Sequence, residues 1–286
     1  MNLTKTQIAG AAVSIGLMIP ATALAATIIG GPGNEHLRGT NAADHIDGKG
    51  GNDRITGRGG DDRLIGGPGN DRVFGNRGND TITGVAGNDL LVGGSGDDAI
   101  TGDNNDTGDL TSFDRVFGGA GNDTLKGGDS ADRMAGGAGN DRSFGEDGRD
   151  RMSGGTGDDA QDGGEGDDVI YANGGQDTSI GGDGDDVLWA LARSDVHPGP
   201  NGEVDQAGDT LDGANGNDVL RTRDGEVDRV TCGAGNDRAL LDTVDVIADA
   251  TAQNPKGSCE VVQRKAPRAA DSRHEDVQES PKEATA

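Results

Sequence analysis

Aromatic and other large apolar side chains are scarce in this sequence. Its 286 residues include four Phe, one Tyr and one Trp, and hydrophobic residues make up only 31% of the chain. Such a chain cannot bury the thick apolar core of an ordinary globular domain of this length. Low hydrophobicity together with a formal net charge of −26 would by itself indicate disorder, but the apolar residues that are present recur at regular intervals.

Positive charge is also in short supply, because 25 Lys and Arg residues stand against 51 Asp and Glu residues. An excess of this size repels the phosphates of nucleic acids and anionic lipids and attracts cations. We therefore expect cations, and no nucleic acid, among the partners of this protein.

Long hydrophobic runs are absent after residue 25, so no later segment has the length of a transmembrane helix. The N-terminus carries Lys5, a short apolar stretch from Ile8 to Leu17, a break at Pro20 and small residues around Ala25. This order predicts a secretory signal peptide over residues 1–25, and a secreted protein that is extracellular or held at the cell surface. A membrane anchor is the alternative.

Cysteine occurs only at Cys232 and Cys259. An even count in an exported chain favours one disulfide between them. Two free thiols, or half of a metal site, are the alternatives. A zinc site would need further Cys or His ligands, and none of the four His residues lies nearby.

What the chain does have is Gly and Asp at a fixed period. Residues 66–74 read G-G-P-G-N-D-R-V-F, residues 93–101 read G-G-S-G-D-D-A-I-T, and residues 118–126 read G-G-A-G-N-D-T-L-K. All three match the nonapeptide G-G-x-G-x-D-x-U-x, where U is a large apolar residue. Blocks in this phase run from Gly30 to Leu240, with an acidic residue at position 6 and an apolar residue at position 8 in nearly all of them.

Each position of the block has a structural consequence. Glycines at positions 1, 2 and 4 permit positive φ and close backbone approach, and Asn or Asp at position 5 tolerates left-handed geometry. Positions 1 to 6 therefore predict a tight turn. Positions 7 to 9 alternate polar, apolar and other residues, which predicts a very short strand with its middle residue pointing inward. Successive turns alternate sides, so two blocks make one coil.

From about residue 30 to residue 240 the sequence resembles the RTX (repeats-in-toxin) family, whose hemolysin-type repeats bind calcium. The resemblance implies an all-β fold, a right-handed parallel β-roll with two nonapeptides per coil. It also implies Ca²⁺ between turns one coil apart, held by the position-6 carboxylate and turn carbonyls. Carried over to this sequence, the metal ligands are Asp53, Asp62, Asp71, Asp80, Asp89, Asp98, Asp123, Asp132, Asp141, Asp150, Asp159, Asp168, Asp177, Asp186, Asp218 and Asp237.

Calcium also fits the chemistry of the residues. Ca²⁺ takes six to eight oxygen ligands in flexible geometry, whereas Mg²⁺ dehydrates reluctantly and fits all-protein cages poorly. One large apolar side chain per block does not offset the entropy lost on ordering the whole block, and stacked carboxylates repel one another. We therefore predict a chain that folds on binding several calcium ions. Acidic residues that merely solvate the surface are the alternative, which would not explain a fixed phase at position 6.

The pattern breaks in several places. Residues 102–108 and 190–203 are insertions, expected to be loops on one face, and the blocks around Asp209 and Asp228 depart from the consensus and are not counted as calcium sites. Position 8 is polar at three places, each one coil from the next, which predicts a weakly packed stretch from about 143 to 180; these residues are Ser143, Gln161 and Ser179. Position 9 holds five of the six aromatic residues, either as a shield for the thin core or as a docking surface; these are Phe74, Phe117, Phe144, Tyr171 and Trp189.

The sequence divides into four parts: the signal peptide (1–25), the RTX roll (26–240), a C-terminal cap (241–262) and a disordered tail (263–286). The preferred function is calcium binding by a secreted structural protein, expected to be a monomer. The alternative is a calcium-dependent adhesin or matrix protein that binds a glycan or a protein partner. Neither H-E-x-x-H nor G-x-S-x-G occurs, and no region outside the repeats is long enough for a catalytic domain, so we predict that the chain is not an enzyme.

Overall fold

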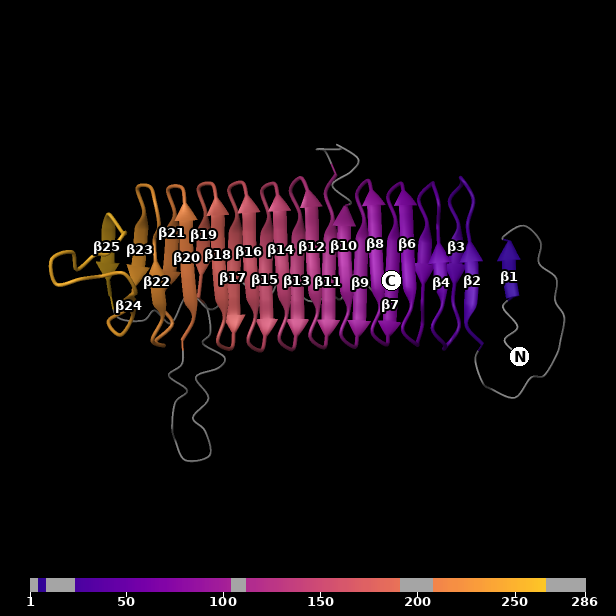
Figure 1. Ribbon diagram of the computed structural model, residues 1–286, viewed down its shortest axis with the longest axis horizontal. Helices are drawn as coiled ribbons and strands as arrows, with labels where there is room; N and C mark the ends of the chain where they lie inside the picture. The colour runs from indigo at the N-terminus through magenta and orange to yellow at the C-terminus, as the bar shows by residue number, and fades with distance from the viewer. Residues whose placement is uncertain (1–4, 9–23, 104–111, 191–207, 266–286) are drawn as a thin grey trace, which may run out of the picture.

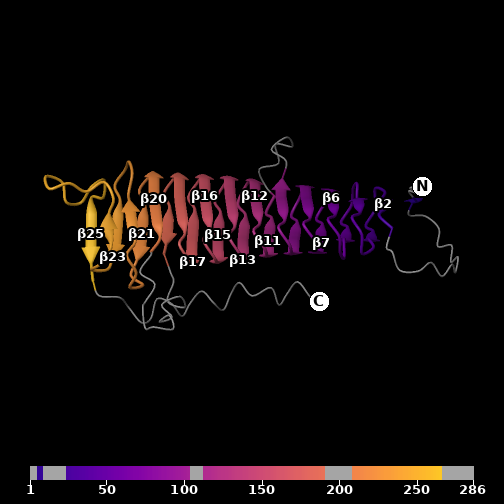
Figure 2. The same cartoon turned by 60° about the horizontal axis from the view of Figure 1, so that its bottom comes forward.

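Repetition of the nonapeptide block stacks the chain into two facing sheets of parallel strands (Figure 1). The computed structural model describes residues 5–8, 24–103, 112–190 and 208–265. Within these ranges every regular element is a strand. From β2 onward consecutive strands alternate between the sheets, and the result is the predicted β-roll, seen from a second direction in Figure 2.

The first sheet contains β1 and the even-numbered strands. In spatial order these are β1 (Lys5–Ile8), β2 (Ala26–Ile29), β4 (His45–Asp47), β6 (Arg63–Pro68), β8 (Thr81–Ala86), β10 (Ala99–Asp103), β12 (Thr124–Asp129), β14 (Arg142–Asp147), β16 (Ala160–Glu165), β18 (Thr178–Asp183), β20 (Thr210–Asn215), β22 (Arg229–Thr231) and β24 (Val246–Ile247).

The second sheet contains the remaining odd-numbered strands. In spatial order these are β3 (His36–Arg38), β5 (Arg54–Thr56), β7 (Arg72–Arg77), β9 (Leu90–Ser95), β11 (Arg115–Ala120), β13 (Arg133–Ala138), β15 (Arg151–Thr156), β17 (Val169–Gly174), β19 (Val187–Trp189), β21 (Val219–Thr222), β23 (Arg238–Leu241) and β25 (Val261–Arg264).

Neighbouring strands in a sheet are one coil apart in the chain. Ile46 pairs with Leu64 and Val73 pairs with Leu91, so each residue meets its equivalent two blocks later. Two nonapeptides therefore make one coil, as the sequence predicts. After the first insertion the chain between paired residues becomes longer, as between Leu91 and Val116, but the alignment of equivalent block positions is kept.

The core is a single inward row of position-8 side chains from each sheet. Almost all of these side chains are fully buried, while positions 7 and 9 on either side of them are exposed or half-buried in most strands. The large buried members are Leu37, Ile46, Ile55, Leu64, Val73, Ile82, Leu91, Ile100, Val116, Leu125, Met134, Met152, Ile170, Leu188, Leu211, Leu220 and Val230. So thin a core contains few apolar contacts per residue, which limits how much the hydrophobic effect contributes to folding.

The predicted polar interruption lies in the first sheet. Ser143, Gln161 and Ser179 pair in register on β14, β16 and β18, and all three side chains are buried. Ser179 Oγ donates to Gln161 Oε1 at 3.1 Å. Ser143 Oγ and Gln161 Nε2 have no hydrogen-bond partner among the described residues. Buried polar groups without partners lower stability, so we expect this stretch to be less stable than the apolar parts of the core.

Replacing Ser143 with Val is expected to stabilise the folded protein by about 1–2 kcal/mol, because it removes an unpartnered buried hydroxyl and adds apolar burial. Chemical denaturation at saturating calcium measures the change in the free energy of unfolding. Ser153→Val is the control, since Ser153 Oγ accepts a hydrogen bond from Asn173 Nδ2 at 2.6 Å and its loss should destabilise the roll. A stabilisation of both variants would contradict this account.

The ends of the roll differ from the predicted boundaries. β1 lies inside the predicted signal peptide and pairs with β2, and β25 extends the cap into residues 263 and 264. Gly102 and Asp103 belong to β10 rather than to an insertion. The rest of the signal peptide up to residue 23, most of both insertions and the tail beyond residue 265 lie outside the described residues.

Candidate metal centre

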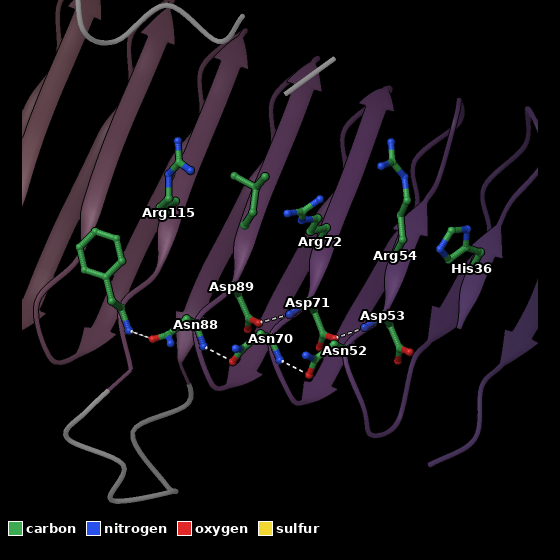
Figure 3. Close-up of a pocket in the computed structure, with 12 residues that line it drawn as sticks. His36, Asn52, Asp53, Arg54, Asn70, Asp71, Arg72, Asn88, Asp89 and Arg115 are labelled. Atoms are coloured by element: carbon green, nitrogen blue, oxygen red, sulfur yellow. Dashed lines mark hydrogen bonds between the residues drawn. The ribbon is translucent and has the colours of Figure 1, made fainter. Parts of the chain in front are cut away.

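The position-6 aspartates form two ladders along the turns that join the sheets. In each ladder the backbone N–H of one aspartate donates to Oδ1 of the aspartate one coil later, as from Asp53 to Asp71 and from Asp71 to Asp89, both at 2.7 Å. This bond orients each carboxyl group along the axis of the roll. Figure 3 shows part of one ladder, with Asp53, Asp71 and Asp89 on consecutive turns.

The ladders extend along nearly the whole roll. The ladder that precedes the second sheet contains Glu35, Asp53, Asp71, Asp89, Asp114, Asp132, Asp150, Asp168, Asp186, Asp218, Asp237 and Glu260. The ladder that precedes the first sheet contains Asp44, Asp62, Asp80, Asp98, Asp123, Asp141, Asp159, Asp177, Asp209, Asp228 and Asp245.

The second carboxylate oxygen of the ladder residues is buried without a hydrogen-bond donor. Within the described residues this holds for Oδ2 of Asp53, Asp62, Asp71, Asp80, Asp89, Asp98, Asp114, Asp123, Asp132, Asp141, Asp150, Asp159, Asp168, Asp177, Asp186, Asp218, Asp228 and Asp237. A buried anionic oxygen with no donor is costly. A row of them indicates that a cation, rather than a protein group, is the intended partner.

Backbone carbonyls approach the same points. A Cβ built on Gly66, at position 1 of its block, would overlap Asp71 Oδ2 and would lie 2.9 Å from the carbonyl oxygen of Gly84. The same holds at Gly75, where Asp80 Oδ2 and the Gly93 carbonyl converge. Position 1 is therefore glycine because a side chain would fill the space between a carboxylate oxygen and a carbonyl oxygen from the next coil.

Position 4 is glycine for a second reason. Gly69 has φ 142°, and a Cβ there would collide with the carbonyl oxygen of Gly51 one coil earlier. The turns therefore stack with their backbones in direct contact, which brings carbonyl groups of successive coils close to the carboxylate row.

Burial raises the pKa of the ladder carboxyl groups. It is the largest influence on Asp89 and Asp132, whose pKa values rise to about 9. The backbone N–H bond from the preceding ladder residue lowers these pKa values, and the charge of neighbouring carboxylates raises them. The pKa of Asp71 and Asp141 rises to about 6 for the same leading reason. Without a cation, the roll therefore resists full ionisation of its ladders at neutral pH.

The donor set consists of hard oxygen atoms. Among the described residues no three His, Cys, Asp or Glu side chains form a ready cluster for a metal ion, so each carboxylate needs carbonyl oxygens to complete a coordination shell. Carboxylates combined with carbonyls are typical of Ca²⁺ sites, whereas Zn²⁺ prefers Cys and His. The buried Oδ2 atoms without donors, and the space that each position-1 glycine leaves between a carboxylate and a carbonyl oxygen, fit calcium.

All sixteen aspartates predicted as metal ligands lie in these two ladders. Five further ladder aspartates were not among the predicted ligands: Asp44, Asp114, Asp209, Asp228 and Asp245. The blocks around Asp209 and Asp228 depart from the consensus, and Asp245 lies in the predicted cap, beyond the last block. The surviving signal is an aspartate two residues before a buried apolar residue, as in Asp44–Ile46 and Asp114–Val116.

The first insertion does not break a ladder. Gly102 has the same role for Asp114 as Gly66 has for Asp71, because a Cβ on Gly102 would overlap Asp114 Oδ2. The ladder bonds from Asp89 to Asp114 and from Asp98 to Asp123 cross the insertion with the same donor and acceptor atoms as elsewhere in the roll. The register of the ladders is therefore the same on both sides of the insertion.

A further acidic group lies at the C-terminal end, outside the nonapeptide pattern. Asp224 and Asp242 are buried beside the ladder residues Asp228 and Asp245. Burial, followed by the charge of Asp224, raises the pKa of Asp228 to about 10. Nothing in the repeat period identifies Asp224 or Asp242, because neither occupies position 6.

The predicted disulfide is present. Cys232 and Cys259 are bonded and buried, and Ser258 Oγ accepts hydrogen bonds from the backbone N–H groups of Cys232 and Gly233 at 2.9 and 3.0 Å. The bond ties the segment before β25 to the end of β22.

Loss of this disulfide in a Cys232→Ser/Cys259→Ser variant is expected to lower stability by about 3–4 kcal/mol, because the bond closes a loop with a sequence separation of 27 residues. Thermal unfolding at saturating calcium measures the effect. Reduced wild-type protein serves as the control and should unfold like the variant. Equal melting temperatures for the variant and the oxidised protein would refute the expectation.

Comparison with protein-family models gives one match, to the RTX calcium-binding nonapeptide repeat. The matched segments, which together cover more than half of the chain, are residues 29–64, 38–73, 47–82, 65–100, 74–107, 111–143, 144–160, 162–188 and 205–239. The chain belongs to this family. No curated protein matches the sequence.

Membership in the RTX family identifies calcium as the cation for which the ladders are built. RTX repeats form a structural calcium-binding fold, and proteins that contain them are typically extracellular. None of the described residues of this RTX chain forms a helix that could cross a bilayer.

Proposed function

We propose that this RTX chain is a secreted, non-catalytic calcium-binding protein whose roll folds when Ca²⁺ occupies the two aspartate ladders. The observation that carries the proposal is the row of buried Oδ2 atoms without donors, most of them close to a glycine carbonyl of the next coil. Calcium between successive turns would convert the repulsion along each ladder into attraction.

The predicted signal peptide supports the secreted state, because it leads to calcium-rich surroundings. Cleavage after Ala25 would remove β1 and leave β2 as the edge of the first sheet. The disulfide between Cys232 and Cys259 also fits an oxidising compartment.

Replacing Asp132 with Asn tests the proposed ligands one at a time. Asn retains an Oδ1 acceptor for the N–H of Asp114, which is 2.8 Å away, but it replaces the orphaned Oδ2 with a neutral amide. We expect calorimetric titration to show about one or two fewer bound calcium ions and a higher calcium concentration at the folding midpoint.

Asp167→Asn is the matched control. Asp167 is exposed at position 5, where its Oδ1 accepts a hydrogen bond from the backbone N–H of Asp185 and its side chain pairs with Arg149. This variant loses the same charge but no ladder oxygen, and it should keep the wild-type stoichiometry. Equal calcium stoichiometry in all three proteins would rule out Asp132 as a ligand.

A calcium-dependent adhesin is the second candidate function. The observation that favours it is the outward face of the second sheet, where arginines at position 7 lie close to aromatic rings at position 9, as Arg54 does to Phe74 and Arg151 to Tyr171. This face carries a charge pattern that the repeat itself does not require.

A further inference from the structure

The outer faces of the two sheets carry different charges. Positions 7 and 9 of the second sheet contain no Asp or Glu in any described strand, although the chain as a whole has a formal charge of −26. The arginines at these positions are Arg38, Arg54, Arg72, Arg115, Arg133, Arg151, Arg221 and Arg238. The charged residues of this face are therefore basic, on an acidic protein.

The first sheet shows that the repeat does not require this arrangement. Its outward positions carry Arg63, Lys126, Arg142 and Arg229, but also Asp47, Asp162 and Asp212. Both sheets have the same strand geometry and place position 8 inward, and none of those inward residues is charged, so the charge of the second sheet's outer face comes from its outward side chains. Like charges on directly paired strands are unfavourable, and their accumulation on one face points to an anionic partner.

Aromatic rings accompany the arginines of this face. The guanidinium of Arg54 lies 5.2 Å from the centre of the Phe74 ring, that of Arg151 lies 4.6 Å from Tyr171, and that of Arg221 lies 4.2 Å from Trp189. A guanidinium held against a ring loses less freedom when it binds an anion, and its planar donors match a carboxylate or sulfate. The aromatic residues are therefore positioning residues for arginines.

A hollow of about 630 Å³ lies at the N-terminal end of the same face (Figure 3). His36, Arg54 and Arg72 line it on neighbouring strands, and Arg115 lies one strand further on, beyond Leu90 of β9. Asp53, Asp71 and Asp89 lie along its turn edge, and the other lining residues are Asn52, Asn70, Asn88 and Phe113. Three arginines and three aspartates cancel in formal charge. Calcium on the aspartates would leave the hollow positive.

We propose that the outer face of the second sheet binds a linear acidic polysaccharide, with Arg54, Arg72 and Arg115 receiving its carboxylate or sulfate groups when calcium occupies the adjacent ladder. Neighbouring strands of a sheet are about 4.8 Å apart, which is similar to the advance of one sugar ring in an extended polysaccharide. Successive sugars can thus meet successive strands. The inference rests on the proposed function, because the ladder must hold calcium.

A single-stranded nucleic acid is the competing polyanion. Its bases need open aromatic faces on which to stack, and here guanidinium groups already lie over Phe74, Phe117, Tyr171 and Trp189. A polysaccharide needs only the guanidinium groups, so the occupied ring faces do not oppose its binding.

Binding of labelled full-length protein to four polymers tests the proposal: polygalacturonate, dextran sulfate, neutral dextran and oligothymidylate. All measurements are made at one buffered free calcium concentration, because polygalacturonate itself binds calcium. We expect polygalacturonate or dextran sulfate to bind and dextran not to bind. The Arg54→Gln/Arg72→Gln/Arg115→Gln variant should bind about tenfold more weakly or worse.

The matched control is Arg63→Gln/Arg142→Gln/Arg229→Gln, which removes three position-7 arginines from the first sheet. It should bind like the wild type. Equal weakening in both triple variants, no binding of either acidic polysaccharide, or tighter binding of oligothymidylate would overturn the proposal. Circular dichroism at the same calcium concentration distinguishes a failure of this inference from a failure of the proposed function. A folded protein that binds no polysaccharide refutes this inference alone. A protein whose strand signal does not respond to calcium refutes the proposed function.

Discussion

Removal of calcium is expected to unfold the roll and abolish most of its strand signal in circular dichroism. The reason lies in the thin core, which buries one large side chain per block, and in the ladders, which place buried carboxylates on successive turns with no donor for Oδ2. Ions that bind only the folded state stabilise it by mass action. Without them the repulsion within each ladder opposes folding along its whole length.

Calcium titration of the chelator-treated protein, followed by circular dichroism and hydrodynamic radius, measures this transition. The midpoint is expected at about 10⁻⁴–10⁻³ M free calcium, as in other extracellular modules. Titration with magnesium is the control and should not restore the strands, because Mg²⁺ dehydrates reluctantly. A protein that stays equally compact after exhaustive chelation would refute calcium-dependent folding.

The loss of structure is not expected to be uniform. The stretch with Ser143, Gln161 and Ser179 in its core should open first as calcium falls, because these buried polar groups weaken one sheet there. Hydrogen exchange at low calcium should show faster exchange from about residue 143 to residue 180 than in the strands around Ile82 and Leu91. Uniform protection along the roll would show that the polar core positions do not matter.

Acidification is expected to restore strand structure to the calcium-free chain. In the folded state burial raises the pKa of the ladder carboxyls from 3.8 to about 6 in Asp71 and about 9 in Asp89, with the charges of neighbouring carboxylates adding to the effect. A group whose pKa is higher in the folded state favours folding when it is protonated. This contribution is fully present below about pH 4 and is lost as the pH rises through about 6 to 9.

Protonation also removes the buried negative charge and makes Oδ2 a possible hydrogen-bond donor. Glycine carbonyls approach the same points, as that of Gly84 does near Asp71. Circular dichroism of metal-free protein between pH 3 and pH 8 should therefore show more strand at the acidic end. With calcium present the dependence reverses, because protons compete for the same oxygens and raise the calcium midpoint. Strand content that increases with pH in the metal-free protein would contradict the burial of the ladders.

The nonapeptide period of the sequence predicted both the arrangement of the aspartates and the position of the core. The spacing of equivalent aspartates, such as Asp53 and Asp71, follows from two turns per coil, and the buried row follows from position 8. The structure confirms both. Asp44 and Asp114 were not among the predicted ligands, although each occupies position 6 of a block that lacks some of the consensus glycines. The backbone bonds of the ladder tolerate the loss of some of these glycines.

The sequence by itself determined the β-roll, the inward row and the two edges on which aspartates lie, because a strict nonapeptide period fixes which side of the coil each position faces. Only the tertiary structure decided how the roll continues across the insertion. The additional residues lengthen the chain between paired strands, but equivalent block positions still pair, as Leu91 does with Val116. Phe74 and Phe117 lie on opposite sides of the insertion in the chain, yet both pair with Val92 in the second sheet. The tertiary structure also gathered eight arginines on one face, because strand pairing aligns side chains that the linear sequence distributes along nearly the whole roll.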